Sequence, residues 1–358
     1  MATIEPYQTK AGKRWRVRYR KPDRSQTDKR GFKTKRDAQL FAATVETSKA
    51  TGTYIDPTAG RVTIGDLGPA WLSRQGHVKE STKRRNEIAW RVQVAPTFAT
   101  TPVSALRRSH VTAWVAELTA KKSATVVRTA YGVLRGIIND AVADGLIHAS
   151  PIDGVPMPKK QPKRQIFLTH EDVDRLAEHS AYPLVVRLLA YTGLRWGEMA
   201  GLQVQDINFL RNRLRVERSI SRVGSRMVTG TVKTHEARTV PVPGFLMSDL
   251  KAHVAGMEPG QLVFTHAGKP LAGSNATHKD GWLTVACKRA GIPRITPHDL
   301  RHTAASLAVQ AGANVKVIQR MLGHKSAAVT LDIYSALFDG DLDDVATALD
   351  TARSEALG

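Results

Sequence analysis

The 358-residue chain has a single cysteine, a minority of acidic residues and no long apolar run. Cys287 cannot form an internal disulfide, and no CxxC or CxxH pattern is present, which excludes a disulfide framework and a zinc site of the usual spacing. We expect Cys287 to be a buried helix residue. No segment approaches the roughly 18 consecutive apolar residues that span a bilayer, and "MATIEPYQTK" lacks the apolar core of a signal peptide. A cytoplasmic protein with no membrane partner is predicted.

Basic residues dominate the charge. Lys and Arg total 53 against 32 Asp and Glu, which gives a formal net charge of +21 and an isoelectric point near 10.3. Such a balance predicts a polyanionic partner. The length and the 42% hydrophobic content are enough for two or three packed domains.

The basic excess is strongest in residues 10–36, which hold 13 Lys or Arg and two acids. In "RWRVRYR" arginines alternate with apolar and aromatic residues, and this period of two predicts a strand with one basic and one apolar face. Helical spacing begins after Thr34, a candidate N-cap. We expect residues 1–55 to form a small three-stranded sheet plus a helix, with the basic face of the sheet entering a DNA groove. A merely solvated basic face is the alternative. The candidate DNA contacts are Arg14, Arg16, Arg18, Arg20, Lys33 and Lys35.

Residues 56–64 are rich in Gly, Thr and Pro, which is typical of a linker. Residues 65–150 contain four stretches with apolar residues three and four positions apart, which predicts a four-helix domain. Basic side chains there, including Arg84 and Arg85, are candidates for phosphate contacts, although such charges are most often simply solvated. Residues 151–165 hold four prolines among basic residues and are typical of a second linker.

A third, mostly helical domain is expected over residues 166–338. Arg195 follows a Thr-Gly break, and Glu198 lies one turn further on, where its carboxylate can hold the guanidinium. An ordinary helix ion pair is the alternative. Residues 213–243 have strand propensity interrupted by glycines, which predicts a small β-meander with Lys233 at or near a tight turn.

The segment "TPHDLRHTAASLAVQAG" predicts a helix that begins at Pro297. His298 and Arg301 share its first turn, where backbone N–H groups also favour an anion. His298 and His302 could instead bind a metal, but no third ligand lies at a telling spacing. No metal or other cofactor is therefore predicted.

His324 follows the glycine that ends the next helical stretch, and Tyr334 lies near the end of the same motif. Two arginines, two histidines and a lysine around a tyrosine hydroxyl are the groups that phosphoryl transfer to a phenol needs. Arginine forks bind phosphate oxygens and oppose charge in the transition state. The phenol supplies an oxygen nucleophile, histidine can move the proton, and lysine can protonate the departing alkoxide.

At these residues the chain resembles the tyrosine recombinases, and among them the phage-type integrases. "TGLRWGE", "HDLRHTAAS", "MLGHKSAAVTLDIY" and the lysine of "TVKTHEARTVPVP" match the family's motifs over about residues 165–340. One departure is Ala336, where many relatives have a histidine two residues after the tyrosine. The resemblance implies the following roles: Tyr334 as nucleophile, Arg195 and Arg301 as phosphate clamp, Lys233 as general acid, His298 and His324 as acid/base or hydrogen-bonding groups, and Glu198 as structural support.

The same resemblance implies a site-specific recombinase that integrates and excises a mobile element through a 3′-phosphotyrosyl intermediate, without ATP or metal. Its implied partners are double-stranded DNA at arm and core sites, a homotetramer on that DNA, a host DNA-bending protein and an excision-directing factor. Its implied location is the host bacterial cytoplasm, at the nucleoid. The acidic segment 339–358 is either a solvated tail or a helix that docks in trans.

Three alternatives stay open. A type IB topoisomerase shares the catalytic set, but the separate N-terminal domain argues against it. A non-catalytic DNA-binding relative would not need the complete catalytic set. A Xer-type or transposon-type recombinase commonly lacks the extra N-terminal domain.

Overall fold

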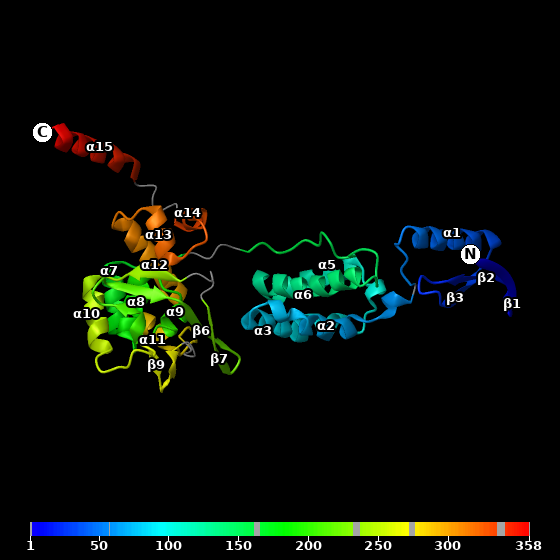
Figure 1. Ribbon diagram of the computed structural model, residues 1–358, viewed down its shortest axis with the longest axis horizontal. Coiled ribbons are helices and arrows are strands. Elements are labelled where there is room, and N and C mark those ends of the chain that lie inside the picture. Colours follow the sequence, from blue (N-terminus) through cyan, green and yellow to red (C-terminus); the bar gives the residue numbers. More distant parts are fainter. Residues whose placement is uncertain are drawn as a thin grey trace. The chain divides into compact units, whose positions relative to one another are not determined.

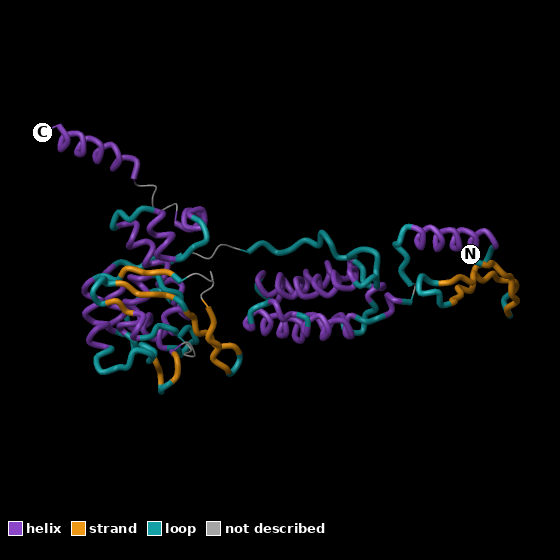
Figure 2. The backbone as a smooth tube through the Cα atoms, in the orientation of Figure 1, coloured by secondary structure: helices purple, strands orange, loops and turns teal. Residues whose placement is uncertain are grey.

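The structure is a computed structural model that describes residues 2–56, 58–160, 165–231, 237–271, 276–334 and 341–357. The chain divides into two compact units, Met1–Gln161 and Pro162–Gly358. Helices dominate, and the strands form small antiparallel sheets (Figures 1 and 2). The expected α+β class is confirmed.

The first unit opens with a three-stranded sheet in the order β1-β2-β3, and one helix follows it. These elements are β1 (Thr3–Thr9), β2 (Gly12–Arg20), β3 (Gln26–Phe32) and α1 (Lys35–Ala50). Val17 and Tyr19 on β2 are buried in one cluster with α1, so the predicted apolar face is confirmed. Thr34 caps α1 as expected, because its Oγ1 accepts a hydrogen bond from the amide of Asp37 at 3.1 Å.

Helices form the rest of this unit. They are α2 (Ile64–Ser73), α3 (Glu80–Ala89), α4 (Ala95–Phe98), α5 (Arg108–Lys121) and α6 (Ala124–Ala143). A π-helical turn, Trp90–Val94, joins α3 to α4 without a break, so the four predicted helical stretches are present. In the core, Phe98 packs edge-on against Trp114 with ring centroids 5.2 Å apart.

The second unit packs helices and short strands around one large apolar core. Its helices are α7 (His170–Glu178), α8 (Pro183–Thr192), α9 (Trp196–Ala200), α10 (Gly244–His253), α11 (Trp282–Arg289), α12 (Pro297–Gln310), α13 (Val315–Leu322), α14 (Ala327–Tyr334) and α15 (Asp341–Leu357). Its strands are β4 (Ile207–Asn208), β5 (Arg213–Val216), β6 (Arg218–Val223), β7 (Arg226–Thr231), β8 (Arg238–Pro241), β9 (Thr265–His266) and β10 (Lys269–Pro270). At the centre, α8 lies against both α7 and α12 (Figure 1).

The predicted meander resolves into two pieces. One is a sheet in the order β4-β5-β8, and the other is the hairpin β6-β7, which turns at Gly224 with φ 64°. The split has a packing reason: Leu214 on β5 and Val240 on β8 face each other and are both fully buried, so β8 pairs with β5. Lys233, predicted at or near a tight turn of the meander, lies outside the described residues.

Cys287 is buried in α11, as predicted. Among the described residues, every helix is too short or too polar to cross a membrane. The acidic segment forms α15, whose Leu349 and Leu357 side chains are exposed. Whether α15 docks in trans stays a prediction.

Candidate active site

The site begins where α8 ends. Gly193 caps α8 in the left-handed conformation, with φ 63°, and a Cβ at this position would come within 2.5 Å of a methyl group of Leu322. This tight turn places Arg195 at the start of α9, beside the end of α13. Its guanidinium donates to the Glu198 carboxylate at 2.7 Å and to the Gly323 carbonyl at 3.0 Å.

Glu198 is almost fully buried and holds two arginines, not one. Arg238 on β8 meets its carboxylate with both terminal nitrogens, at 2.9 and 2.7 Å. Burial alone would raise the pKa of Glu198, but the hydrogen bonds and charge of Arg238, with those of Arg195, lower that pKa to about 2. Glu198 is therefore ionised, and the carboxylate fixes the positions of both guanidinium groups.

Arg301 is the largest fully buried side chain of the unit. Its guanidinium donates to two backbone carbonyls, those of Gly193 and Leu322, which end α8 and α13. Burial, followed by the charge of Arg195, lowers the pKa of Arg301 to about 9. The side chain thus joins three helices at one point and keeps a positive charge there.

The N-terminus of α12 is fixed by a reciprocal cap between Thr296 and Asp299, with Pro297 in the first turn. His298 is exposed in this turn, whereas Arg301 points into the core, so the two predicted partners lie on differently exposed parts of the helix. The imidazole of His298 instead meets that of His302, edge to face, with centroids 4.6 Å apart.

Tyr334 ends α14 and is 1% exposed. Its hydroxyl is 2.8 Å from Nδ1 of His302, a residue that the sequence reasoning considered only as a metal ligand. Burial raises the pKa of Tyr334 to about 12, against the opposing charge of Arg301. In the part of the chain that the structure describes, no group of three or more His, Cys, Asp or Glu is arranged to hold a metal.

His324 lies just after Gly323, which caps α13 with φ 65°. Its Nδ1 is 3.0 Å from the hydroxyl of the buried Thr330. Burial, followed by the charges of Arg301 and Arg195, lowers the pKa of His324 to about 4, so the imidazole is neutral at pH 7. A pocket of about 590 Å³ opens here, and its basic lining consists of Arg238, Arg320, His324 and Lys325.

The fold therefore brings together five of the predicted site residues. Arg195 and Arg301 bond to consecutive carbonyls at the end of α13, and His324 follows in the chain. Glu198 holds Arg195, while Tyr334 reaches α12 through His302. Two further residues of this cluster, Arg238 and His302, were not among the predicted site residues. Arg238 stands inside the quoted motif "THEARTVPVP", and His302 follows Arg301 directly.

The predicted DNA contacts on the N-terminal sheet differ in their pairing. Arg16 donates to Glu5 at 3.0 and 2.7 Å, and Arg18 lies 3.6 Å from the same carboxylate. Lys35 lies over the Trp15 ring at 5.8 Å. The remaining candidates on this sheet and its connection to α1 are Arg14, which is partly exposed, and Arg20 and Lys33, which are exposed.

On α3, both predicted phosphate contacts are exposed. Arg84 lies 3.5 Å from Glu87 in a surface ion pair, and Arg85 is its neighbour in the chain. An exposed pair of this kind holds its partners weakly, so it leaves the arginine able to exchange Glu87 for a phosphate.

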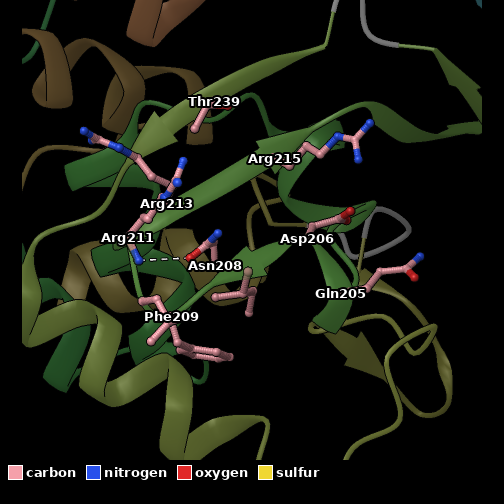
Figure 3. A pocket seen from close by; sticks show the side chains of 10 residues that line it. Gln205, Asp206, Asn208, Phe209, Arg211, Arg213, Arg215 and Thr239 are labelled. Atoms are coloured by element: carbon pink, nitrogen blue, oxygen red, sulfur yellow. Dashed lines mark hydrogen bonds between the residues drawn. The ribbon is translucent and has the colours of Figure 1, made fainter.

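A second basic pocket, of about 620 Å³, was not predicted. It lies beside β4 and β5 and presents Arg211, Arg213 and Arg215 (Figure 3). The signal was present in the alternation of "RNRLRVER", where buried Leu214 separates two exposed arginines.

Known proteins resemble this chain in sequence and in fold. The sequence model of the family described as "Phage integrase family" matches residues 166–340. The integrase of Mycobacterium phage FRAT1 is 33% identical over 281 residues, which cover 74% of this chain and 81% of the relative. The integrase of Mycobacterium phage D29 is also 33% identical, over 74% of this chain and 72% of its own length.

Solved structures share the fold at lower identity. A lambda integrase tetramer bound to a Holliday junction aligns with TM-score 0.62 and 19% identity, and covers 90% of this chain and 96% of that one. The Tn1549 transposon integrase in complex with a circular intermediate DNA aligns with TM-score 0.65 and 20% identity, over 76% of this chain and 95% of that one.

Proposed function

The chain belongs to the phage integrase family and is a tyrosine-type site-specific DNA recombinase, and we propose that Tyr334 is its nucleophile. The observation that carries this assignment is the cluster around the ends of α8 and α13. Two guanidinium groups, from Arg195 and Arg301, are held there by hydrogen bonds to the Gly193, Leu322 and Gly323 carbonyls. A fixed pair of cations beside a tyrosine suits a phosphodiester that gains charge as it reacts.

In the proposed reaction the Tyr334 oxygen attacks the scissile phosphorus and forms a phosphotyrosine at the DNA 3′ end. The bond from phosphorus to the 5′ oxygen breaks, and Lys233 gives that oxygen its proton. Arg195 and Arg301 bind the non-bridging oxygens, and His298 and His324 assist by hydrogen bonding or proton transfer. The 5′-hydroxyl of the partner duplex then attacks the phosphotyrosine, so neither ATP nor a metal is needed.

Arg238 is a further residue of the proposed site, one that the sequence did not suggest. It shares Glu198 with Arg195 and donates to the Met321 carbonyl at 3.1 Å. Arg238 therefore links β8 to α13 and to the start of α9. We assign it a positioning role, because it holds Glu198, which in turn holds Arg195.

The proposed division of labour follows the predicted domains. Residues 1–55 bind arm-type DNA, residues 65–150 and 166–338 bind the core site, and segments 56–64 and 151–165 link them. Arg14, Arg16, Arg18, Arg20, Lys33, Lys35, Arg84 and Arg85 contact DNA in this proposal. The chain acts as a tetramer at the nucleoid of the host cytoplasm, with a DNA-bending protein and an excision-directing factor, and 339–358 docks on a neighbouring subunit.

A covalent trap tests the proposal. Wild type, Tyr334→Phe and the control Tyr191→Phe are incubated with DNA of the source genome and quenched in detergent, and the protein-linked ends are sequenced. We expect 3′-linked adducts at one short sequence with wild type and the control, and none with Tyr334→Phe. Scattered adducts would favour a topoisomerase, and the absence of any adduct on bound DNA would refute the assignment.

A further inference from the structure

The hydrogen bond between His302 and Tyr334 suggests a role for a residue to which the family resemblance assigned none. In the described part of the chain, Nδ1 of His302 lies 2.8 Å from the phenolic oxygen, with ring centroids 5.7 Å apart and planes at 63°. The oxygen that makes this bond is the atom that must lose its proton to attack phosphorus. The inference below rests on the proposed function of Tyr334.

Two features favour a protein base at this position. Tyr334 is 1% exposed, so bulk water does not surround its hydroxyl. The burial also disfavours the phenolate, because a buried anion loses its hydration. A phenol in such a place reacts faster when a neighbouring group removes the proton as the oxygen attacks.

His302 is held so that it can be this group. It lies one helical turn after His298, whose ring packs edge-on against it at 4.6 Å. Both rings lie on α12, and Thr296 caps the first turn of this helix. Arg301, on the same helix, donates hydrogen bonds to two backbone carbonyls in the core. The imidazole is thus placed by a rigid helix rather than by a loop.

We propose that His302 is the general base that activates Tyr334. The lone pair of Nδ1 takes the phenolic proton as the bond from the tyrosine oxygen to phosphorus forms. The bond from phosphorus to the 5′ oxygen breaks, and that oxygen takes its proton from the general acid, assigned here to Lys233. In the reverse step His302 returns its proton to the departing phenolate.

The charged and titratable groups near the pair fit this direction of transfer. Among the described residues they include His298 and Arg301 on α12 and His324 after α13. The positive charge of Arg301 favours the phenolate, and the neutral His324 adds no repulsion to an imidazolium at His302. The proton therefore has an acceptor on one side of the tyrosine and a stabilising cation near it.

The test uses two DNA substrates that carry the core sequence. One has the natural oxygen at the scissile 5′ position, and the other has a bridging sulfur, a leaving group that needs no proton. His302→Asn keeps a polar side chain of similar reach but cannot serve as a base at neutral pH, and His302→Ala removes it. His170→Asn is the matched control, because Nδ1 of His170 is 2.7 Å from the hydroxyl of Tyr191 on the same unit.

We expect both His302 variants to form the covalent adduct about 10²-fold to 10³-fold more slowly on either substrate. Lys233→Ala should be slow on the oxygen substrate alone, and His170→Asn should match wild type. Wild type should level off once its imidazole is neutral, whereas His302→Asn should keep accelerating about tenfold per pH unit as phenolate accumulates. If His302 only held the tyrosine in place, the rates of wild type and of His302→Asn would depend on pH in the same way.

Two contrary results have different meanings. An adduct that requires Tyr334 but forms as fast in His302→Asn and His302→Ala as in wild type would overturn this inference alone. An adduct that persists in Tyr334→Phe would overturn the assignment of the nucleophile, and the inference with it. Urea unfolding midpoints of the variants show whether a slow variant is merely unfolded, and either variant that remains folded is sufficient for the comparison.

Discussion

The two units of the chain use charge in opposite ways. Around α9 the charges are buried and matched, so that Glu198 alone fixes two guanidinium groups and Arg301 is bonded to two carbonyls. On the N-terminal sheet the basic side chains are numerous and partly exposed, and a single acid, Glu5, serves two of them. Removing a charged side chain around α9 therefore leaves its partners with no substitute, whereas removing one from the N-terminal sheet leaves neighbouring basic side chains that can take its place.

The largest effect should follow from Arg301→Lys. Lysine keeps a charge but cannot bond two carbonyls and a phosphate with one planar fork. We expect adduct formation to fall by about 10³-fold, measured as detergent-stable adduct per minute. Arg320→Lys changes an exposed arginine of the neighbouring pocket in the same way and should cost less than about tenfold. Equal effects of the two substitutions would remove the distinction between matched and shared charge.

Glu198→Gln should lower the free energy of unfolding by about 3–5 kcal/mol, because it leaves Arg195 and Arg238 without their buried carboxylate. Urea denaturation of the whole chain measures this change. The control is Glu217→Gln, since Glu217 pairs with Arg215 and Arg218 at a partly exposed position. It should cost less than about 1 kcal/mol. A mild effect of Glu198→Gln would show that the buried carboxylate is replaceable.

Acid should destabilise the matched site in two steps. In the folded chain the pKa of His324 is lowered to about 4 and that of Glu198 to about 2. Each group therefore contributes its full stability when the pH is above its pKa in the unfolded chain, and loses this contribution as the pH falls toward its folded pKa. Stability should drop between about pH 6.5 and 4 through His324, then between about 4.5 and 2 through Glu198, by up to about 3 kcal/mol each. His324→Gln should remove the first step in a pH series of urea midpoints. A first step that survives in this variant would belong to another histidine.

The smallest effects are expected on the N-terminal sheet. Arg20→Ala should weaken binding to arm-type DNA by less than about tenfold and reduce the slope of log affinity against log salt by about 0.9. Arg16→Ala should change less, because Arg16 must first release Glu5 to reach a phosphate. Titrations at several salt concentrations measure both values. A loss of all binding from either single change would mean that this surface also depends on individual residues.

The features predicted correctly from the sequence were those with a local cause. Thr34 caps a helix because an amide lies three residues ahead, and Val17 is buried because every second residue of a strand faces one way. The family motifs likewise identified Arg195, Arg301, His324 and Tyr334 as site residues. Their functional roles stay predictions, and so do the domain limits.

What the sequence did not reveal depends on long-range packing. Arg238 meets Glu198 across 40 positions of the chain, and only after β8 pairs with β5. His302 reaches Tyr334 across 32 positions, once α14 packs near α12. Neither partner can be recognised from neighbours in the sequence, because polar residues one turn along a helix or inside a strand are usually solvated.

The π-helical turn in the helical part of the first unit has a consequence for length changes. Trp90–Val94 accommodates one residue more than an α-helical turn would. Deleting one residue there would let the backbone return to regular α-helical pairing and would leave the residues beyond it close to their present phase. A deletion in a purely α-helical segment would instead rotate everything beyond it by about 100° and shift it by about 1.5 Å. The π turn is therefore the place in this helix where one residue can be removed with the least effect on the contact between Phe98 and Trp114.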